Sequence, residues 1–168
     1  MTNRSHSALG SEAILRRPGD ADVVGNPLGG SVTYWARSEE TAGAMTVLES
    51  VVAPGEGPPL HAHGNEDEFV YVLEGTLRVR LEEAVREAPA GSFVFIPSGL
   101  VHTWKNAGDG AARFLFGFTP AASGMERLFE RGAEFEADTW IAEGFGRFAG
   151  DAGMEVLGPP LAQSDPKR

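Results

Sequence analysis

The chain has 168 residues, enough for one hydrophobic core and short for two, so we expect a single domain. Its net charge of −10, from 14 basic and 24 acidic residues, disfavours binding to nucleic acid phosphates and to anionic lipid. The absence of cysteine excludes disulfides, thiolate metal sites and cysteine nucleophiles, so histidine, carboxylates and water are the ligands left for a metal ion.

The two ends of the sequence are polar and lack the periodicity of a helix or strand. We expect residues 1–12 to be a flexible lead rich in Ser, Asn and Gly, and residues 158–168 to be a proline-rich tail. The first residues do not resemble a secretory signal, and no apolar run approaches the length of about 18 residues that a membrane-spanning helix needs. A cytoplasmic protein without membrane contact is therefore expected.

Residues 13–157 are expected to form the folded domain. Short runs rich in Val, Ile, Phe and Tyr alternate there with Gly and Pro, which are turn signals. These runs cover residues 31–36, 44–52, 68–75, 76–81, 91–96, 101–106 and 112–118. Such spacing predicts an all-β sandwich or barrel, and because no internal repeat is visible we expect one barrel.

The apolar pattern within two of these segments predicts how each is covered. In residues 76–81, leucine and valine alternate with arginine, so one face should pack on the core and the other should contact water. In residues 68–75, apolar side chains occupy both faces. Such a strand is expected to be covered on both sides, by a second sheet or by a second subunit.

After Pro120 the pattern changes to that of a helix. Met125, Leu128 and Phe129 recur at helical spacing, and Ser123 can cap the first turn. We therefore expect one or two short C-terminal helices from about residue 121, packed on the outside of the barrel or over its mouth.

Two of the four histidines, His61 and His63, lie two residues apart and are followed by acidic residues. Side chains at this spacing leave the same face of a strand, and Glu68 can return to that face from the next segment. His102 is the candidate fourth ligand, because a turn at residues 97–99 begins a new strand before it. Such a set suits a divalent transition metal and leaves coordination positions open. Since a histidine in a strand is more often a core or surface residue than a ligand, the spacing alone leaves both interpretations open.

Two longer patterns surround these residues. The first, G-x5-H-x-H-x4-E-x6-G, spans residues 55–75, and the second, G-x5-P-x-G-x2-H-x3-N, spans residues 91–106, with 15 residues between them. Both reproduce the two motifs of the cupin superfamily at a typical separation. Residues 44–119 therefore resemble a cupin, and the resemblance implies a single jelly-roll (cupin) β-barrel.

The resemblance also implies one divalent metal ion inside the barrel, with His61, His63, Glu68 and His102 as its ligands. These ligands do not distinguish Fe, Ni, Mn, Co, Cu and Zn, because affinity follows the Irving–Williams order and cellular supply decides the rest. Cupins often pair, so a homodimer is expected. Many cupins keep the fold without enzyme activity, so the fold alone does not decide the function.

Residues 61–79 look most like the single-domain bacterial cupins similar to quercetin 2,3-dioxygenase. This resemblance implies a metal-dependent dioxygenase, an oxidoreductase that combines a small enolic or aromatic, flavonol-like substrate with O2. Glu68 would then be the catalytic residue, as a metal ligand and general base. Two alternatives stay open. One is an O2-independent isomerase or cyclase of secondary metabolism, and the other is a small-molecule-binding protein without turnover.

Candidates for the substrate pocket follow from parity along the strands. Val70 and Val72 share the parity of Glu68, and Trp104 shares the parity of His102, so these three side chains are expected to face the cavity. The phenylalanines of the last predicted strand are expected to be barrel core more often than a platform for a planar ligand.

Overall fold

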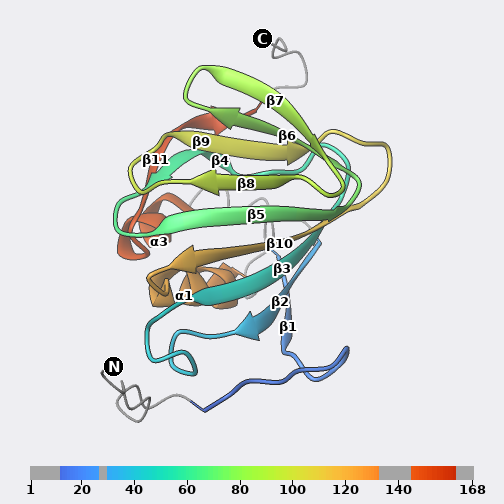
Figure 1. The fold of residues 1–168 in the computed structure, drawn as a ribbon. Coiled ribbons are helices and arrows are strands. Elements are labelled where there is room, and N and C mark those ends of the chain that lie inside the picture. The colour runs from blue at the N-terminus through green and yellow to red at the C-terminus, as the bar shows by residue number, and fades with distance from the viewer. Residues whose placement is uncertain (1–11, 27–29, 133–144, 162–168) are drawn as a thin grey trace, which may run out of the picture.

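The computed structural model of the chain describes residues 12–26, 30–132 and 145–161. Within these ranges, eleven strands form two antiparallel sheets, and two helices lie beside them (Figure 1). The all-β fold with two short helices confirms the class predicted from the sequence. Among the described residues, no helix is both long enough and apolar enough to span a membrane.

The larger sheet has six strands in the order β1-β2-β3-β10-β5-β8. Its members are β1 (Val23–Gly25), β2 (Ser31–Ala36), β3 (Thr46–Val52), β5 (Asp67–Glu74), β8 (Phe93–Ile96) and β10 (Ala112–Thr119). The smaller sheet has five strands in the order β11-β4-β9-β6-β7. Its members are β4 (Pro59–His63), β6 (Thr76–Leu81), β7 (Ala84–Pro89), β9 (His102–Asn106) and β11 (Met154–Pro160).

Each of the seven predicted segments contains one strand of the structure. Of the other four strands, β4 was expected only through the strand spacing of His61 and His63, and β1, β7 and β11 were not predicted. In β11, Gly158 and two prolines give no strand signal, yet the strand pairs with β4 through Pro160. Proline is tolerated there because β11 is the edge of its sheet. The first three residues of the expected tail, 158–160, therefore belong to the smaller sheet.

The hydrophobic core lies between the two sheets. Its largest fully buried apolar side chains come from both of them and are Tyr34, Phe114, Phe118, Leu48, Leu77 and Ile96. The alternation predicted for β6 is present, because Leu77 and Val79 are buried whereas the arginines between them are not. The inner faces thus supply the apolar area whose removal from water drives folding.

The outer face of β5 was predicted to be covered as well. In the single chain, Tyr71 on this face is 40% exposed, and its neighbours on β8, Phe93 and Phe95, are 63% and 53% exposed. Phe69 packs closely over the backbone of Gly117, where a Cβ atom would lie 2.7 Å from the ring. An exposed aromatic patch of this kind suits a protein partner. The homodimer expected from the sequence stays a prediction, and this patch is the surface on which it can be tested.

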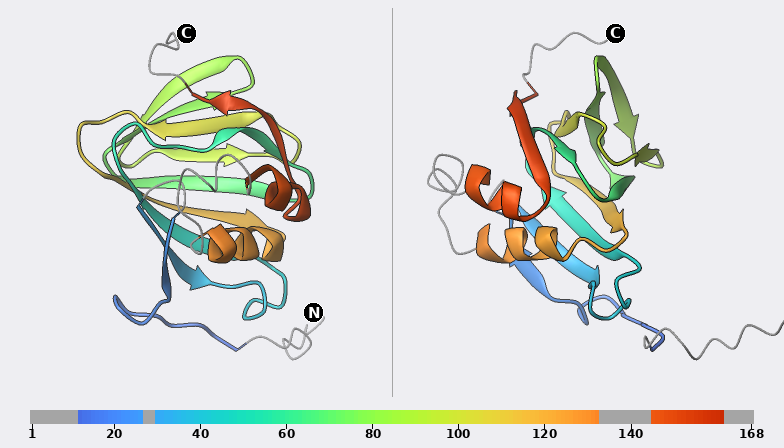
Figure 2. Two further views of the ribbon diagram at one scale, coloured as in Figure 1. Left: turned by 180° about the vertical axis from the view of Figure 1, so that it is seen from behind. Right: turned by 90° about the vertical axis from the view of Figure 1, so that its left-hand side faces the viewer.

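The helices α1 (Ser123–Gly132) and α3 (Phe145–Asp151) lie together on one side of the sandwich (Figure 2). The apolar residues at helical spacing in α1 are buried. A buried carboxylate also holds this helix to the barrel. Glu126 accepts hydrogen bonds from the backbone N–H of Ser38 at 2.7 Å and from Thr46 Oγ1 at 2.6 Å, while Tyr34 donates to the Glu126 carbonyl at 3.1 Å.

Replacing Glu126 with Ala is expected to destabilise the protein by about 2–3 kcal/mol, because the part-buried N–H of Ser38 and the buried hydroxyl of Thr46 lose their acceptor. Urea unfolding followed by circular dichroism measures this change. Glu130→Ala, one turn further along α1, is the matched control. Glu130 is exposed and pairs with Arg37, so its loss should cost at most about 1 kcal/mol. Equal costs for the two variants would contradict an anchoring role for Glu126.

Candidate metal centre

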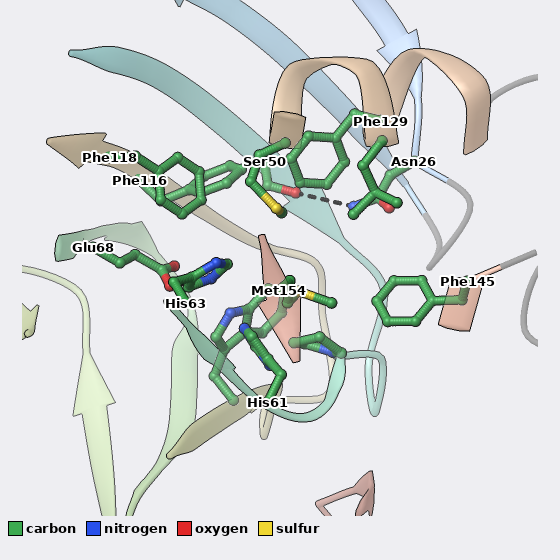
Figure 3. Close-up of a pocket in the computed structure, with 14 residues that line it drawn as sticks. Asn26, Ser50, His61, His63, Glu68, Phe116, Phe118, Phe129, Phe145 and Met154 are labelled. Carbon is green, nitrogen blue, oxygen red and sulfur yellow. Dashed lines mark hydrogen bonds and ion pairs between the residues drawn. The ribbon is translucent and has the colours of Figure 1, made fainter. Parts of the chain in front are cut away.

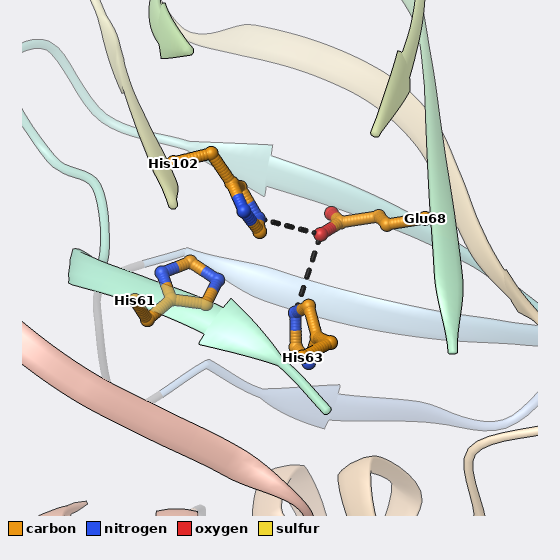
Figure 4. Close-up of side chains that lie close together, drawn as sticks. All are labelled: His61, His63, Glu68 and His102. Carbon is orange, nitrogen blue, oxygen red and sulfur yellow. Dashed lines mark hydrogen bonds and ion pairs between the residues drawn. The ribbon is translucent and has the colours of Figure 1, made fainter. Parts of the chain in front are cut away.

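The structure brings the four predicted ligands together inside the barrel (Figure 4). Strand β4 supplies His61 and His63, β5 supplies Glu68, and β9 supplies His102. One ligand atom from each residue lies within 4.8 Å of all the others, and all four side chains are buried. His61 and His102 are direct cross-strand partners, which fixes their spacing. The sequence prediction that these residues converge is therefore confirmed.

A network between the two sequence motifs holds the loop that connects β4 to β5. Asp67 Oδ1 accepts a hydrogen bond from the backbone N–H of Ser98 at 2.8 Å, and Ser98 Oγ donates to the Gly64 carbonyl at 2.9 Å. Gly99, at a φ of +80° that favours glycine, donates its N–H to the His63 carbonyl at 2.7 Å. These bonds fix the position of His63 relative to the turn that precedes His102.

Two of the imidazoles are oriented by backbone carbonyls. His61 Nδ1 donates to the Pro59 carbonyl at 2.8 Å, and His102 Nδ1 donates to the Leu100 carbonyl at 2.9 Å. In His61 this leaves Nε2 as the nitrogen with the lone pair. In His102, Nε2 also carries a proton, because it donates to the Glu68 carboxylate at 2.9 Å, and this proton would leave when a metal binds. Such second contacts fix the tautomer and the ring orientation of metal-ligating histidines.

The electrostatics of the cluster favour the metal-binding protonation states of Glu68 and His61, whereas His102 has to lose a proton before it can coordinate a metal. Burial acts to raise the pKa of the Glu68 carboxyl, but hydrogen bonds with His102 (2.9 Å) and His63 (3.3 Å) hold this pKa well below its usual range. Burial, with smaller contributions from His102 and His63, lowers the pKa of His61 to about 3. For His102, the bond to Glu68 outweighs burial and raises the pKa. Glu68 is therefore a carboxylate and His61 a neutral imidazole near pH 7.

The donor set fits a divalent transition metal. Two ligand atoms on opposite sides of a metal ion are about 4.2 Å apart, which is twice the length of a metal–nitrogen bond. The four ligand atoms here lie within 4.8 Å of one another, so shifts of a few tenths of an ångström would bring all of them to one ion. His63 Nδ1 is buried and has no hydrogen-bond partner among the described residues, which is costly for an isolated imidazole. The group could therefore bind a metal, and its ligands leave the identity of the metal open.

An apolar cavity lies beside this cluster (Figure 3). His61, His63 and Glu68 form its polar end. The aromatic and methionine side chains of its wall are Trp104, Phe116, Phe118, Phe129, Phe145, Met125 and Met154. The cavity thus has a charged, imidazole-rich end and an aromatic interior. Small-molecule sites usually combine such an apolar lining with a few polar groups that orient the ligand.

The pocket predictions have mixed outcomes. Trp104 lines the cavity as predicted, whereas Val70 and Val72 do not. Both valines are buried in the core, at 2% and 0% exposure, because parity places a side chain on the inner face but does not say how far it lies from the cavity. Phe116 and Phe118, expected as core, are core residues and also form part of the cavity wall.

Sequence reasoning also missed part of the wall. Met125 and Phe129 come from α1, Phe145 from α3 and Met154 from the start of β11. The helical spacing of Met125 and Phe129 was the one available signal. It identified an apolar helix face, but it did not identify what that face contacts.

Comparison with known proteins adds a family relationship. The profile of the family described as "Cupin domain" matches residues 48–118. The chain is similar to Protein SchB of Streptomyces halstedii, 38% identical over 82 residues, which are 49% of this chain and 58% of SchB. It is 37% identical over 82 residues to Polyketide synthase CurC of Streptomyces cyaneus, covering 49% of this chain and 52% of CurC. The chain therefore spans little more than half the length of each relative.

A solved structure supports the same assignment at the level of the fold. An RmlC-like cupin from Shewanella frigidimarina matches with a TM-score of 0.59 at 17% identity, covering 68% of this chain and 96% of that one. The two sheets described above are therefore a cupin jelly roll. Residues 48–118 of this chain match the cupin-domain family, and all four clustered residues lie within this matched segment.

Proposed function

We propose that the protein is a metal-dependent enzyme that acts on a small enolic or aromatic substrate. The observation that carries this proposal is the position of the His-His-Glu-His group at the polar end of an otherwise largely apolar, aromatic cavity. An enolic or phenolic oxygen would lie at the polar end and the ring would lie against Trp104 and Phe116. Such a site positions one edge of a planar molecule at the reactive groups.

In this proposal Glu68 accepts the proton that the substrate oxygen loses, and a metal ion held by the four residues would supply Lewis-acid activation of that oxygen. Glu68 lines the cavity as a carboxylate, and its hydrogen bonds with His102 and His63, which lower its pKa, have to weaken when it accepts the proton. The apolar wall keeps water away from the resulting anion. His61, His63 and His102 hold the ion and keep the Glu68 carboxylate in place.

The size of the cavity constrains how a substrate enters. Its free volume is about 40 Å³, whereas a buried cavity that holds a benzene ring measures about 150 Å³. A ring therefore binds only if part of the wall moves. Met125 and Met154 are flexible side chains suited to such rearrangement, and Phe145 belongs to a short helix at the edge of the barrel.

Two reactions fit this site. The sequence resemblance to quercetin 2,3-dioxygenase-like proteins supports a dioxygenase that consumes O2 with a flavonol-like substrate. The similarity to Polyketide synthase CurC supports a polyketide-like substrate, and for such a substrate we propose an O2-independent cyclase in which Glu68 moves a proton. Both use the same four ligands and the same base, and they differ in whether O2 is a co-substrate.

The deciding experiment begins with elemental analysis by mass spectrometry of untagged protein purified without chelator. The protein is then assayed with quercetin and with a panel of polyphenolic and enolic compounds, in air with an oxygen electrode and under anaerobic conditions. Stoichiometric O2 uptake supports the dioxygenase, and turnover without O2 supports the cyclase or isomerase. Protein that takes up no metal after reconstitution would overturn the proposal. Metal-loaded protein that binds a ligand without turnover would also overturn it and would support a small-molecule-binding protein instead.

Replacing Phe145 with Ala is expected to enlarge the cavity and to favour bulky ligands. Relative to the unmodified protein, we expect the ratio of quercetin affinity to maltol affinity to rise about fivefold or more. Maltol is a single-ring enolic chelator. The variant should lose about 3 kcal/mol in stability. Isothermal titration calorimetry on the metal-loaded protein measures both affinities. Phe148→Ala is the control, because Phe148 belongs to the same helix and packs under Arg131 without lining this cavity. An equal change for both ligands would exclude Phe145 as a size filter.

A further inference from the structure

The cavity has a second polar point, separate from the metal ligands. Asn26 follows β1, and its Nδ2 donates to Ser50 Oγ of β3 at 3.5 Å. Ser50 Oγ donates in turn to the Ser31 carbonyl at 3.2 Å. Both Asn26 and Ser50 line the cavity, and in Figure 3 they lie on one side of it while His61 lies on the other.

Ser50 occupies a position where packing favours an apolar residue. It shares the inner face of β3 with Leu48 and Val52, which are core residues, and with Thr46, whose hydroxyl is bound to Glu126. Ser50 is 1% exposed, and burying a hydroxyl group costs free energy unless its hydrogen bonds are made. The bonds to Ser31 and Asn26 offset this cost, and they hold a hydroxyl on the cavity wall where a ligand can contact it.

The hydrogen bonds of Ser50 define what it can bind. A hydroxyl group has one donor and two acceptor lone pairs. The donor is used by the Ser31 carbonyl, and one lone pair accepts from Asn26, at a distance at the outer limit for such a bond. One acceptor position is left, and the weak bond from Asn26 can lengthen when a ligand approaches. The preferred ligand group is therefore a hydrogen-bond donor, such as a hydroxyl.

We infer that Asn26 and Ser50 recognise a hydroxyl group on the side of the substrate opposite the edge that faces the metal ligands. This inference rests on the proposed function, because it assumes that an enolic edge lies at Glu68 and the histidines. It deepens that proposal by naming the substrate class, a planar ring system that carries oxygen on two opposite sides. A site built to hydrogen-bond such a hydroxyl rejects analogues that lack it. Asn26 lies outside the segment matched by the cupin profile, whereas Ser50 lies within it.

Kojic acid and allomaltol are a matched pair of probes. Both are single-ring compounds that chelate a metal through the same neighbouring hydroxyl and carbonyl. On the opposite side of the ring, kojic acid carries a hydroxymethyl group where allomaltol carries a methyl group. Calorimetric titration of protein reconstituted with Zn²⁺ is expected to show that kojic acid binds about three- to tenfold more tightly, the effect of one hydrogen bond.

Ser50→Ala is expected to remove this preference by weakening kojic acid alone, and Asn26→Ala is expected to reduce it. Thr103→Val is the matched control, because it removes another buried hydroxyl, bound to the Pro58 carbonyl at 2.7 Å, from the outward face of β9. Thermal unfolding of all variants shows whether each one is folded. If Ser50→Ala does not fold, the test depends on whether Asn26→Ala reduces the preference for kojic acid over allomaltol.

The outcomes separate this inference from the proposed function. Equal binding of the two probes by the unmodified protein would overturn the inference and leave the proposed function in place. A preference for kojic acid that persists in both variants would also overturn it. If neither probe binds the Zn²⁺-loaded protein, the enolic edge is not recognised at the metal ligands, and the proposed function fails together with the inference.

Discussion

Replacing His102 with Ala is expected to lower the affinity for a divalent metal ion by at least about a hundredfold, while the barrel still folds. Removing even a group that only orients a metal ligand typically costs about ten- to a hundredfold in affinity, and His102 would be a ligand itself. The change also removes the 2.9 Å partner of the Glu68 carboxylate. Metal content per chain after dialysis, measured by elemental mass spectrometry, gives the result.

The neighbouring variant Thr103→Val controls for damage to strand β9. It loses a buried hydrogen bond one residue further along but no metal ligand, so its metal content should match that of the unmodified protein. Circular dichroism shows whether both variants keep the barrel. A His102→Ala variant that retains its full metal content would remove His102 from the ligand set.

Replacing Glu68 with Gln is expected to separate metal binding from proton transfer. The amide oxygen can still coordinate a metal ion, so most of the metal should remain bound. The amide cannot accept the substrate proton, and we expect turnover to fall by about 10² to 10⁴, the usual contribution of a general base. Metal content and kcat are measured on the same preparation.

Ligand binding is the necessary control for this variant. Glu68 lines the cavity, so a change in its shape could also weaken the substrate complex. Glutamine has nearly the same shape, and the affinity for allomaltol should change much less than kcat does. Full turnover in Glu68→Gln would exclude Glu68 as the base while leaving its role as a ligand untouched.

The sequence predicted those strands whose apolar pattern is strong. In β6, leucine and valine alternate with arginine, and both the strand and its buried face were predicted correctly. Strand β7 carries one fully buried valine among charged residues and small ones, so its pattern is weak. Strand β11 is held by its pairing with β4, which no local pattern in residues 154–160 reveals.

The convergence of the ligands was predictable, but the cavity was not. Spacing within β4 and the turn before β9 place three imidazoles on two neighbouring strands of one sheet, and this information is local in the sequence. The wall of the cavity depends on α1, α3 and β11, which meet the barrel only in the folded chain. The parity of Val70 correctly predicted that its side chain lies on the inner face. Parity carries no information on distance from the cavity, and Val70 does not line it.

The placement of the four ligands has a consequence for folding. Glu68 belongs to the larger sheet, whereas His61, His63 and His102 belong to the smaller one. A bound ion would therefore act as a cross-link between the two layers of the sandwich, in a chain that has no disulfide to do so. Because only the folded state presents all four ligands, metal at a hundred times its dissociation constant would add about 2.7 kcal/mol to the free energy of unfolding. The melting temperature would then serve as a direct readout of metal occupancy.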